Sequence, residues 1–428
     1  RHQPRSRGLG DVYKRQTHNA NERHDSSLYF LWRFFFNSNV LGHGNHAVLN
    51  KKKSWRRFTV TERTKKRSFA IIAGGTGGHV YPAISLAEQL VRYKYSIVIL
   101  TDKRGKKFIK PSNNIKVLIL SSPKRTEGWL ASAEKLYFLI KNFFDSMKKL
   151  QSLKPSSVVG FGGYYSISPI IASYALKIPI IIHEQNAVAG RANRFLFPVA
   201  NKIAISFKRI DGLKSNNKKI TRTGTPIRSE FFKLTKALRP RYGKKIDLKV
   251  LIIGGSQGAQ SFSKIIPQAV ALMNARERKR ISINQQCNRG NIYQLKKTYD
   301  NLGVRADLKI FFDNMPKALT SCHFAIARAG ASTIAELEAT NTPSILIPYP
   351  YAKDDHQSQN AWMMKEAGLS WVLEEEKGTS ALLSKLIQKF IKDPRILLNK
   401  RENRRTRVCK NGGNNLAKHC INILNEKI

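Results

Sequence analysis

A glycine-rich turn that ends in a histidine is the strongest chemical signal in this sequence. The apolar run Ala70–Ala73 leads into Gly74–Gly78, and His79 follows at the start of a helical pattern. A helix start presents unpaired backbone N–H groups and partial positive charge, and glycine lets a phosphate approach them. The loop therefore predicts a phosphorylated ligand. His79 is a candidate for proton transfer, because the helix dipole should lower its pKa and favour the neutral imidazole.

This loop does not match two widely used phosphate motifs. No Gly-Lys-Ser/Thr follows it, as a Walker A loop requires, and Val80 stands where a dinucleotide fingerprint has its third glycine. Asp102 ends the next predicted strand, so a nicotinamide cofactor stays open. Two simpler interpretations also stay open: a tight turn that needs small residues, and a histidine that only hydrogen-bonds the loop.

Three further segments place polar residues after predicted strands. His183–Asn186 either contacts a ligand or braces its own loop. Ala329–Glu336 is a strand–loop–helix turn in which Thr333 and Glu336 have capping-box spacing, although Glu336 could also accept hydrogen bonds from a ribose diol. Lys353–Asn360 contains two acids and a histidine at a spacing that fits no common metal template, so we expect no metal.

Strand and helix patterns that alternate from Ser68 to the end must position these residues, and they predict α/β domains with parallel sheets. A second glycine loop, Gly254–Gly258, follows an apolar run in the same way as the first, which predicts two Rossmann-like domains facing across a cleft and linked near Thr223–Lys245. The expected buried strands are Phe69–Ala73, Ser96–Thr101, Val158–Gly160, Ile178–His183, Leu248–Ile253, Lys309–Phe312, His323–Ala327 and Ser344–Pro348.

The chain is strongly basic: 76 Lys and Arg against 28 Asp and Glu give a net charge of +48 over 428 residues. Of this excess, the first 68 residues supply +12, from 16 basic and 4 acidic residues. Because the excess of positive charge is spread along the whole chain, it argues against a single basic tail that binds nucleic acid. It predicts affinity for anionic surfaces. The four cysteines show no CxxC spacing, so we expect idle thiols. Residues 1–67 are aperiodic, and we interpret them as a disordered extension or a non-native upstream segment.

No run of uncharged apolar residues is long enough to cross a bilayer. Gly128–Lys149, however, predicts a helix with apolar residues around much of its circumference and lysines beside them. This pattern is typical of a helix in the bilayer interface and equally of a core helix with a wide apolar face. The candidate membrane residues are Trp129, Leu136, Phe138, Phe143 and Phe144.

Six blocks, in order and at compatible spacing, together resemble the MurG family of membrane-associated N-acetylglucosaminyltransferases. The resemblance runs from about Ser68 to Ile428 and implies a GT-B fold. It implies an acceptor and membrane domain over 68–227, a UDP-sugar domain over 228–407, and a last helix, about 408–428, that crosses back to the first domain. The matching blocks are Ala73–Pro82, Gly160–Tyr164, His183–Gly190, Gly254–Ala259, Arg328–Glu336 and Asp354–Ala361.

The resemblance also implies a reaction. N-acetylglucosamine would move from UDP-N-acetylglucosamine, with inversion, to the 4-hydroxyl of the N-acetylmuramoyl group of lipid I, giving lipid II. The enzyme would be peripheral, on the cytoplasmic face of the bacterial inner membrane, in contact with anionic lipids. No cofactor, metal or nucleic acid is expected.

Site residues are carried over where the motifs match. His79 would be the catalytic base. Thr76, Gly77 and Gly78 would meet the donor or the acceptor diphosphate, and Ser256 the leaving diphosphate. The remaining donor contacts would be Asn186, Gln357 and His356 at the sugar, Arg228 between the domains, Phe312 at the uracil, Ala331, Ser332 and Thr333 along the nucleotide, and Glu336 at the ribose.

Three other functions stay open. A UDP-N-acetylglucosamine 2-epimerase would share the layout but needs no lipid acceptor, so an exposed apolar helix counts against it. A nicotinamide oxidoreductase would use the first loop with Asp102, yet Val80 and the second loop argue against it. A basic nucleic-acid-binding protein would leave the glycine loops unexplained.

Overall fold

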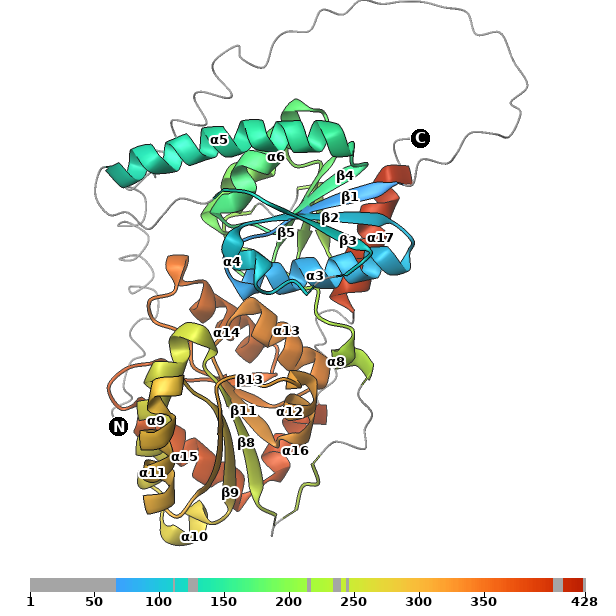
Figure 1. Ribbon diagram of the computed structural model, residues 1–428. Coiled ribbons are helices and arrows are strands. Elements are labelled where there is room, and N and C mark those ends of the chain that lie inside the picture. The colour runs from blue at the N-terminus through green and yellow to red at the C-terminus, as the bar shows by residue number, and fades with distance from the viewer. Residues whose placement is uncertain are drawn as a thin grey trace, which may run out of the picture.

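The computed structural model describes residues 67–110, 112–121, 130–213, 217–233, 240–243, 246–402 and 411–425. The chain forms two parallel α/β domains, as expected (Figure 1). Residues 1–66 and Trp129 lie outside the described part, so the predictions made for them stay untested.

The N-terminal sheet has the strand order β3-β2-β1-β4-β5-β6-β7, and every pair is parallel. Its strands carry Ile and Val on both faces, which suits a sheet covered by helices on each side. The strands are β1 (Ser68–Ile72), β2 (Ser96–Thr101), β3 (Ile115–Ile119), β4 (Ser157–Gly160), β5 (Ile180–Glu184), β6 (Lys202–Ile205) and β7 (Ile220–Arg222). The helices are α3 (Gly77–Arg92), α4 (Lys103–Lys106), α5 (Leu130–Leu153), α6 (Ile167–Ala175) and α7 (Arg191–Leu196).

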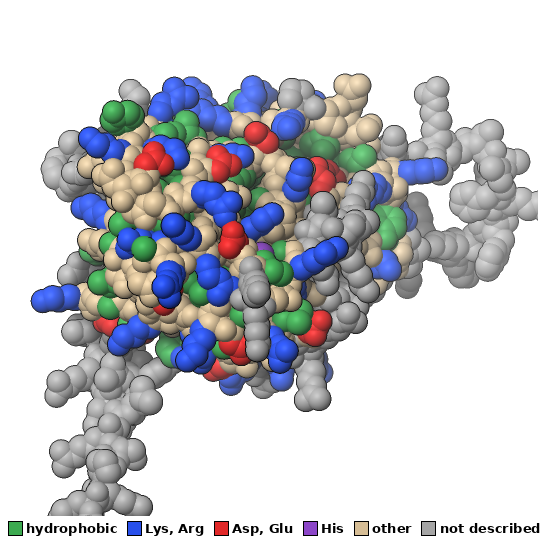
Figure 2. All heavy atoms as spheres, turned by 90° about the horizontal axis from the view of Figure 1, so that it is seen from below, with side chains coloured by type: hydrophobic (Ala, Val, Ile, Leu, Met, Phe, Trp, Pro, Cys, Tyr) green, Lys and Arg blue, Asp and Glu red, His purple; other side chains and the backbone are tan. Residues whose placement is uncertain are grey.

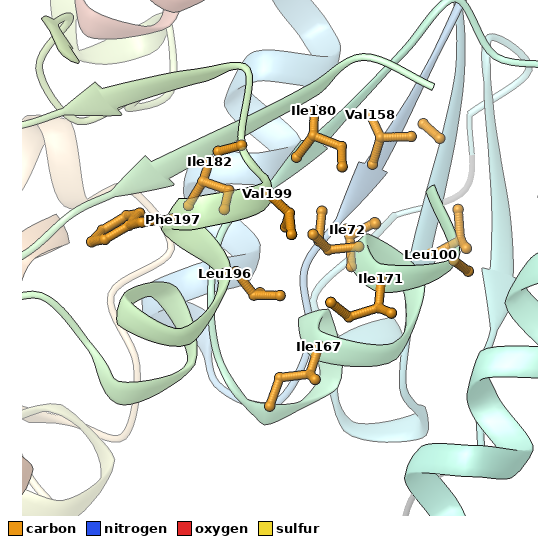
Figure 3. Close-up of a cluster of buried hydrophobic side chains, with 14 of the residues drawn as sticks. Ile72, Leu100, Val158, Ile167, Ile171, Ile180, Ile182, Leu196, Phe197 and Val199 are labelled. Atoms are coloured by element: carbon orange, nitrogen blue, oxygen red, sulfur yellow. The ribbon is translucent and has the colours of Figure 1, made fainter. Parts of the chain in front are cut away.

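Alternate residues of β1 enter two different cores of this domain. Ala70 and Ile72 pack with α5, α6 and α7, in the cluster drawn in Figure 3. Phe69 and Ile71 pack with α3 and with the C-terminal helix α17 (Gly412–Asn425). Figure 1 shows α17 beside the N-terminal sheet, so the end of the chain returns to the first domain.

The C-terminal sheet has the order β10-β9-β8-β11-β12-β13, again parallel throughout. Its strands are β8 (Leu248–Ile253), β9 (Ile281–Gln286), β10 (Arg305–Lys309), β11 (Phe324–Ala327), β12 (Ser344–Leu346) and β13 (Ser370–Val372). A short helix, α8 (Glu230–Lys233), precedes this domain in the linker. The helices of the domain are α9 (Gly255–Ala271), α10 (Ala275–Arg278), α11 (Ile292–Asn301), α12 (Met315–Ser321), α13 (Ala331–Thr340), α14 (His356–Glu366), α15 (Thr379–Lys392) and α16 (Arg395–Glu402).

One expected strand was misplaced. The sequence predicts a buried strand at Lys309–Phe312, but β10 ends at Lys309. As an edge strand, β10 alternates between exposed and half-buried residues and therefore lacks an apolar run. The apolar residues that gave the signal lie after it, where Ile310 and Phe311 are exposed and Phe312 is buried.

The two domains meet through an apolar cluster as well as through polar contacts. Ala187, Phe207 and Ile227 of the first domain are buried in the same cluster as Leu251 and Ile253 of β8. Helices α3 and α13 also touch across the junction. The strand ends that carry the predicted site residues are therefore brought to one interface.

Candidate functional site

The first glycine loop has the geometry expected of a phosphate site. Gly75 has φ +83°, a conformation that favours glycine, and its N–H donates to the buried carboxylate of Asp102 at 2.8 Å. The N-cap Thr76 makes no side-chain cap, and no acid occupies the first turn of α3. The first N–H groups of that helix, at Gly77 and Gly78, thus have no intrahelical acceptor and are available to an anion.

His79 is the third residue of α3 and is half-buried at the domain junction. Burial lowers its pKa below the ordinary 6.5, whereas the charge of Glu184 opposes that shift. The direction agrees with the expectation, but burial is the chief cause. A Cβ built on Gly163 would lie 3.6 Å from Nε2 of His79, so the ring lies close to the Gly162–Gly163 turn. His79 is therefore neutral at pH 7 and able to accept a proton.

Glu184 organises the segment after β5. Its carboxylate accepts hydrogen bonds from the backbone N–H groups of Asn186 at 3.0 Å and Gly190 at 3.0 Å, and from Nδ2 of Asn193 at 2.7 Å. The loop-bracing interpretation of His183–Asn186 is thus confirmed for this acid. Its negative charge also favours the imidazolium that His79 would become on accepting a proton.

His183 has a structural role. It is fully buried, its Nε2 lies 3.0 Å from the carbonyl oxygen of Gly224, and its ring packs beside Phe161. Burial lowers its pKa to about 4, so the imidazole stays neutral. The hydrogen bond fixes a proton on Nε2, because a carbonyl oxygen only accepts.

A pair of asparagines joins the two domains. Asn360 of α14 is fully buried; its Oδ1 accepts from the N–H of Ala187 at 2.7 Å, and its Nδ2 donates to Oδ1 of Asn186 at 3.1 Å and to the carbonyl of Ala329 at 3.0 Å. Nδ2 of Asn186 also donates to Glu184 at 3.3 Å. The amide of Asn186 is therefore fixed in orientation from both sides.

The start of α13 lines the C-terminal side of the junction. The capping box predicted for Thr333 and Glu336 is absent, because the N-cap is Gly330 and no side chain caps this helix. Glu336 is half-buried; burial raises its pKa to about 7, and the charge of Arg228 acts in the opposite direction. Ser332 has a buried hydroxyl with no partner in the described part of the chain.

The other predicted donor residues are distributed as follows. Ala331 is buried and Thr333 half-buried at the same turn, while Phe312 is buried at the end of the β10 loop. Arg228 stacks over Phe231 at 5.3 Å from the ring centroid. Ser256 is the second residue of α9, and its side chain lies outside the described part of the structure.

His356 and Gln357 begin α14, and each has one polar group fixed by the backbone. Nδ1 of His356 donates to the carbonyl of Lys353 at 2.6 Å, because a carbonyl oxygen only accepts. Oε1 of Gln357 accepts from the N–H of Tyr349 at 3.1 Å. The charge of a protonated His356 acts, as the smallest of several causes, to lower the pKa of His79.

Asp102 cannot bind a cofactor ribose as the nicotinamide interpretation requires. Its carboxylate is fully buried and already accepts from Gly75 and Gly105 N–H and from Nε of Arg104. Asp102, the acid on which the nicotinamide interpretation depends, therefore stabilises the loop itself. Among the described residues, no group of three or more His, Cys, Asp or Glu side chains could hold a metal ion.

Helix α5 is partly a core helix and partly exposed. Phe143 is buried and Leu136 packs against the same core, so assigning these two to a membrane face was wrong. Phe138 is half-buried. Phe144 is 63% exposed, and two neighbours on the same surface, Tyr137 at 59% and Ile140 at 39%, were missing from the candidate list. None of the described helices is both long and apolar enough to cross a membrane.

Sequence reasoning missed two residues that organise this junction. Glu184 was noticed only as part of a polar cluster, and Asn360 only as part of a block. Asn360 depends on partners 173 and 174 positions away in the chain, which no local pattern connects. Glu184 has nearby hydrogen-bond partners, but its charge acts on His79 of a different strand–helix unit. A polar residue predicted at a buried helix position, such as Asn360, is the one signal that was available.

Two parallel α/β domains, each with a glycine loop after its central strand, have the GT-B arrangement found in nucleotide-sugar glycosyltransferases. The glycosyltransferase family 28 N-terminal domain matches residues 69–205, and the glycosyltransferase family 28 C-terminal domain matches residues 249–416. The crystal structure of Acinetobacter baumannii MurG has the same fold, with a TM-score of 0.66 at 24% identity over 84% of this chain and 99% of that one.

Relatives at higher identity identify the branch of the family. The chain is 40% identical over 329 residues to the Rhodospirillum centenum UDP-N-acetylglucosamine–N-acetylmuramyl-(pentapeptide) pyrophosphoryl-undecaprenol N-acetylglucosamine transferase, covering 76% of this chain and 86% of that protein. It is 37% identical to the transferase of that name from Rickettsia bellii, covering 79% and 94%. The chain belongs to the MurG family of glycosyltransferases, as its six blocks indicated.

Proposed function

We propose that this protein transfers N-acetylglucosamine from UDP-N-acetylglucosamine to the 4-hydroxyl of the N-acetylmuramoyl group of lipid I, giving lipid II. Membership of the MurG family supports the donor, the acceptor and the reaction. One structural observation supports the site: α3, which carries His79, touches α13, which carries Glu336, across the domain junction.

The residues suggest how the transfer proceeds. His79 accepts the proton of the acceptor hydroxyl as its oxygen attacks the anomeric carbon of the donor, and the bond from that carbon to the UDP oxygen breaks. The sugar centre inverts in this single displacement. Glu184 stabilises the imidazolium, while Arg228 and the α9 N-terminus stabilise the departing diphosphate. Glu336 accepts from the ribose hydroxyls, and Asn186 and Gln357 contact the sugar.

We also propose that the exposed side of α5 binds an anionic membrane, at the cytoplasmic face of the bacterial inner membrane. Tyr137, Ile140 and Phe144 are exposed there, and exposed Lys141 and Lys148 lie on the same helix. Positive charge alone does not select this face, because Figure 2 shows many Lys and Arg side chains on the opposite end of the molecule. The apolar side chains therefore decide the orientation.

Mass spectrometry of the products tests the reaction. The full chain is incubated with UDP-N-acetylglucosamine, with and without a short-chain lipid I analogue. We expect UDP release and a disaccharide-lipid only when the acceptor is present. UDP release or 2-epimerisation without acceptor would contradict the proposal and favour an epimerase.

Vesicle flotation tests the membrane face. Phe144→Glu should reduce binding to vesicles containing anionic lipid by about tenfold or more, because it removes apolar contact and adds negative charge. Its activity on a water-soluble acceptor should not change. Tyr293→Glu is the matched control, since Tyr293 is 83% exposed on the other domain. Equal losses in both variants would show that general charge, and not this face, drives binding.

A further inference from the structure

An arginine–tyrosine pair beside the first glycine loop has no part in the mechanism above. Arg104 is in α4, directly after β2, and Nε of Arg104 donates to the buried Asp102 at 3.2 Å. Its Nη2 donates to the hydroxyl of Tyr165 at 2.6 Å, and the guanidinium lies 5.4 Å from the centroid of the Tyr165 ring. Two elements that are far apart in sequence thus fix the direction of one cation.

The turn that carries Arg104 is closely packed. A Cβ on Gly105 would lie 2.1 Å from Oγ1 of Thr101. Asp102 is the N-cap of α4, and its carboxylate accepts from the N–H of Gly105 at 2.9 Å. Asp102 also accepts from Gly75. The same carboxylate therefore joins the turn of Arg104 to the glycine loop.

Arg104 keeps donors available for a ligand. A guanidinium has five N–H groups, and the bonds to Asp102 and Tyr165 use two of them. No other acceptor for Arg104 occurs among the described residues, and its side chain is 59% exposed. Nη2 lies 3.9 Å from a Cβ built on Gly75, so the remaining donors lie beside the loop and its helix N-terminus.

Together these donors suit a diphosphate better than a single phosphate. Backbone N–H groups at a helix start can hold one phosphoryl group, and a planar guanidinium beside them can bind a second by paired hydrogen bonds. A diphosphate can place one phosphoryl group against each set of donors, which a monophosphate cannot do.

We propose that Arg104, oriented by Tyr165, binds the diphosphate of the lipid acceptor at the first glycine loop and makes the enzyme select a diphosphate-linked acceptor over a monophosphate-linked one. This proposal rests on the proposed function, which supplies a diphosphate-linked acceptor. The domain carrying Arg104 also carries His79, so the acceptor would be held beside its base.

Steady-state kinetics test the selection. In Arg104→Gln, the KM for a short-chain lipid diphosphate acceptor should rise about tenfold or more, with the KM for UDP-N-acetylglucosamine within about twofold of wild type. A monophosphate-linked acceptor should be affected less than about threefold. Tyr165→Phe should show a smaller rise for the diphosphate acceptor, and Lys107→Gln, an exposed neighbour with the same loss of charge, should show none. Equal losses on both acceptors, or a rise in the donor KM, would overturn the proposal.

Direct binding separates this proposal from the reaction itself. Inorganic pyrophosphate is titrated calorimetrically into the full chain saturated with UDP, so that the donor site is occupied. Wild type and Lys107→Gln should bind it, and Arg104→Gln at least about tenfold more weakly. Unchanged binding in Arg104→Gln would refute the role of Arg104 even if lipid II is made. Loss of turnover with this binding pattern intact would instead contradict the proposed function.

Discussion

The two glycine loops occupy equivalent positions but are supported by different side chains. Each follows the central strand β1 or β8 and contains a glycine at positive φ, Gly75 at +83° and Gly255 at +64°. The N–H of Gly75 donates to Asp102 at the end of β2, at 2.8 Å, whereas that of Gly255 donates to Oε1 of Gln286 at the end of β9, at 3.2 Å. The backbone geometry is repeated, while the charge beside it is not.

This difference between the loops suits them to different steps of the reaction. The N-terminal loop has an acid balanced by Arg104 and carries a neutral histidine, which suits proton transfer beside a bound anion. The C-terminal loop has a neutral amide, so nothing at that position opposes the negative charge of a departing diphosphate. Repeated folds can therefore keep one backbone site and change its chemistry through a single neighbouring side chain.

His79→Ala should have the largest effect on this division. Turnover should fall about 10²–10⁴-fold, the usual contribution of a general base, while affinity for UDP-N-acetylglucosamine stays unchanged. Isothermal titration with donor and initial rates with acceptor measure the two quantities separately. A comparable loss of donor affinity would show that the two loops do not divide the work.

The pH profile of the wild-type enzyme gives an independent measurement for His79. Because burial lowers its pKa, the base form is present above that pKa and is lost as the pH falls through it. The acidic limb of kcat/KM, which reports the free enzyme, should therefore lie below pH 6.5, the ordinary value. A limb above that value would assign the base to another group.

Asn360→Ala should remove the hydrogen bonds that join the two domains at the site. It removes three hydrogen bonds and leaves the Ala187 N–H and the Ala329 carbonyl without their partner, so kcat/KM should fall about 100-fold or more. Gln359→Ala changes the neighbouring, half-buried position and is the control. If both variants keep wild-type kcat/KM, the asparagine contact does not position the site.

The sequence predicted the centre of each domain better than its edges. β2 and β8 were placed at their observed bounds, and β1, β4 and β5 nearly so, because strands buried on both faces are continuous apolar runs. The edge strand β10 was misplaced, since half of its residues face solvent and the apolar Ile310 and Phe311 follow it.

The site was predicted where it depends on local patterns and missed where it depends on distant partners. The glycine loops and His79 can be predicted because they follow directly after an apolar strand pattern. Asn360 and Arg104 act through contacts between distant segments, such as the bond from Arg104 to Tyr165, 61 residues away. Glu184 matters to the site through its charge on His79, which lies on another element. The burial of Phe143 in α5 could not be predicted either, because α5 has apolar residues around much of its circumference and the sequence does not show which of them pack against the core.

Glu336→Ala should weaken donor binding by about 1–3 kcal/mol, the scale for hydrogen bonds to a charged group, without changing acceptor affinity. With wild type, donor affinity should fall as the pH drops through about 7, where Glu336 gains a proton. Glu336→Gln should remove that dependence. Glu338 has the same raised pKa of about 7 but interacts with Arg222. The Glu338→Gln variant should therefore keep the pH dependence of donor affinity.

The same two acids make stability depend on pH with a defined sign. Their pKa values in the folded chain lie above the ordinary 4.5, so the folded state binds more protons than the unfolded state between about pH 4.5 and 7. Their contribution therefore destabilises the fold as the pH rises through that window. Denaturant unfolding at both ends of the window should show a smaller change in the Glu336→Gln variant, and an unchanged difference would contradict the raised pKa.

Gln286→Glu should give the smallest effect and tests the comparison directly, because it places an acid beside the second loop as Asp102 stands beside the first. The half-exposed position keeps the added charge partly solvated, so donor affinity should weaken by only about 1 kcal/mol at low ionic strength and less as salt screens it. Asn301→Asp adds the same charge at the end of α11 and should not alter donor affinity. If Gln286→Glu binds donor as wild type does at low salt, the neutral amide is not what suits this loop to a departing diphosphate, and the two loops differ in chemistry for another reason.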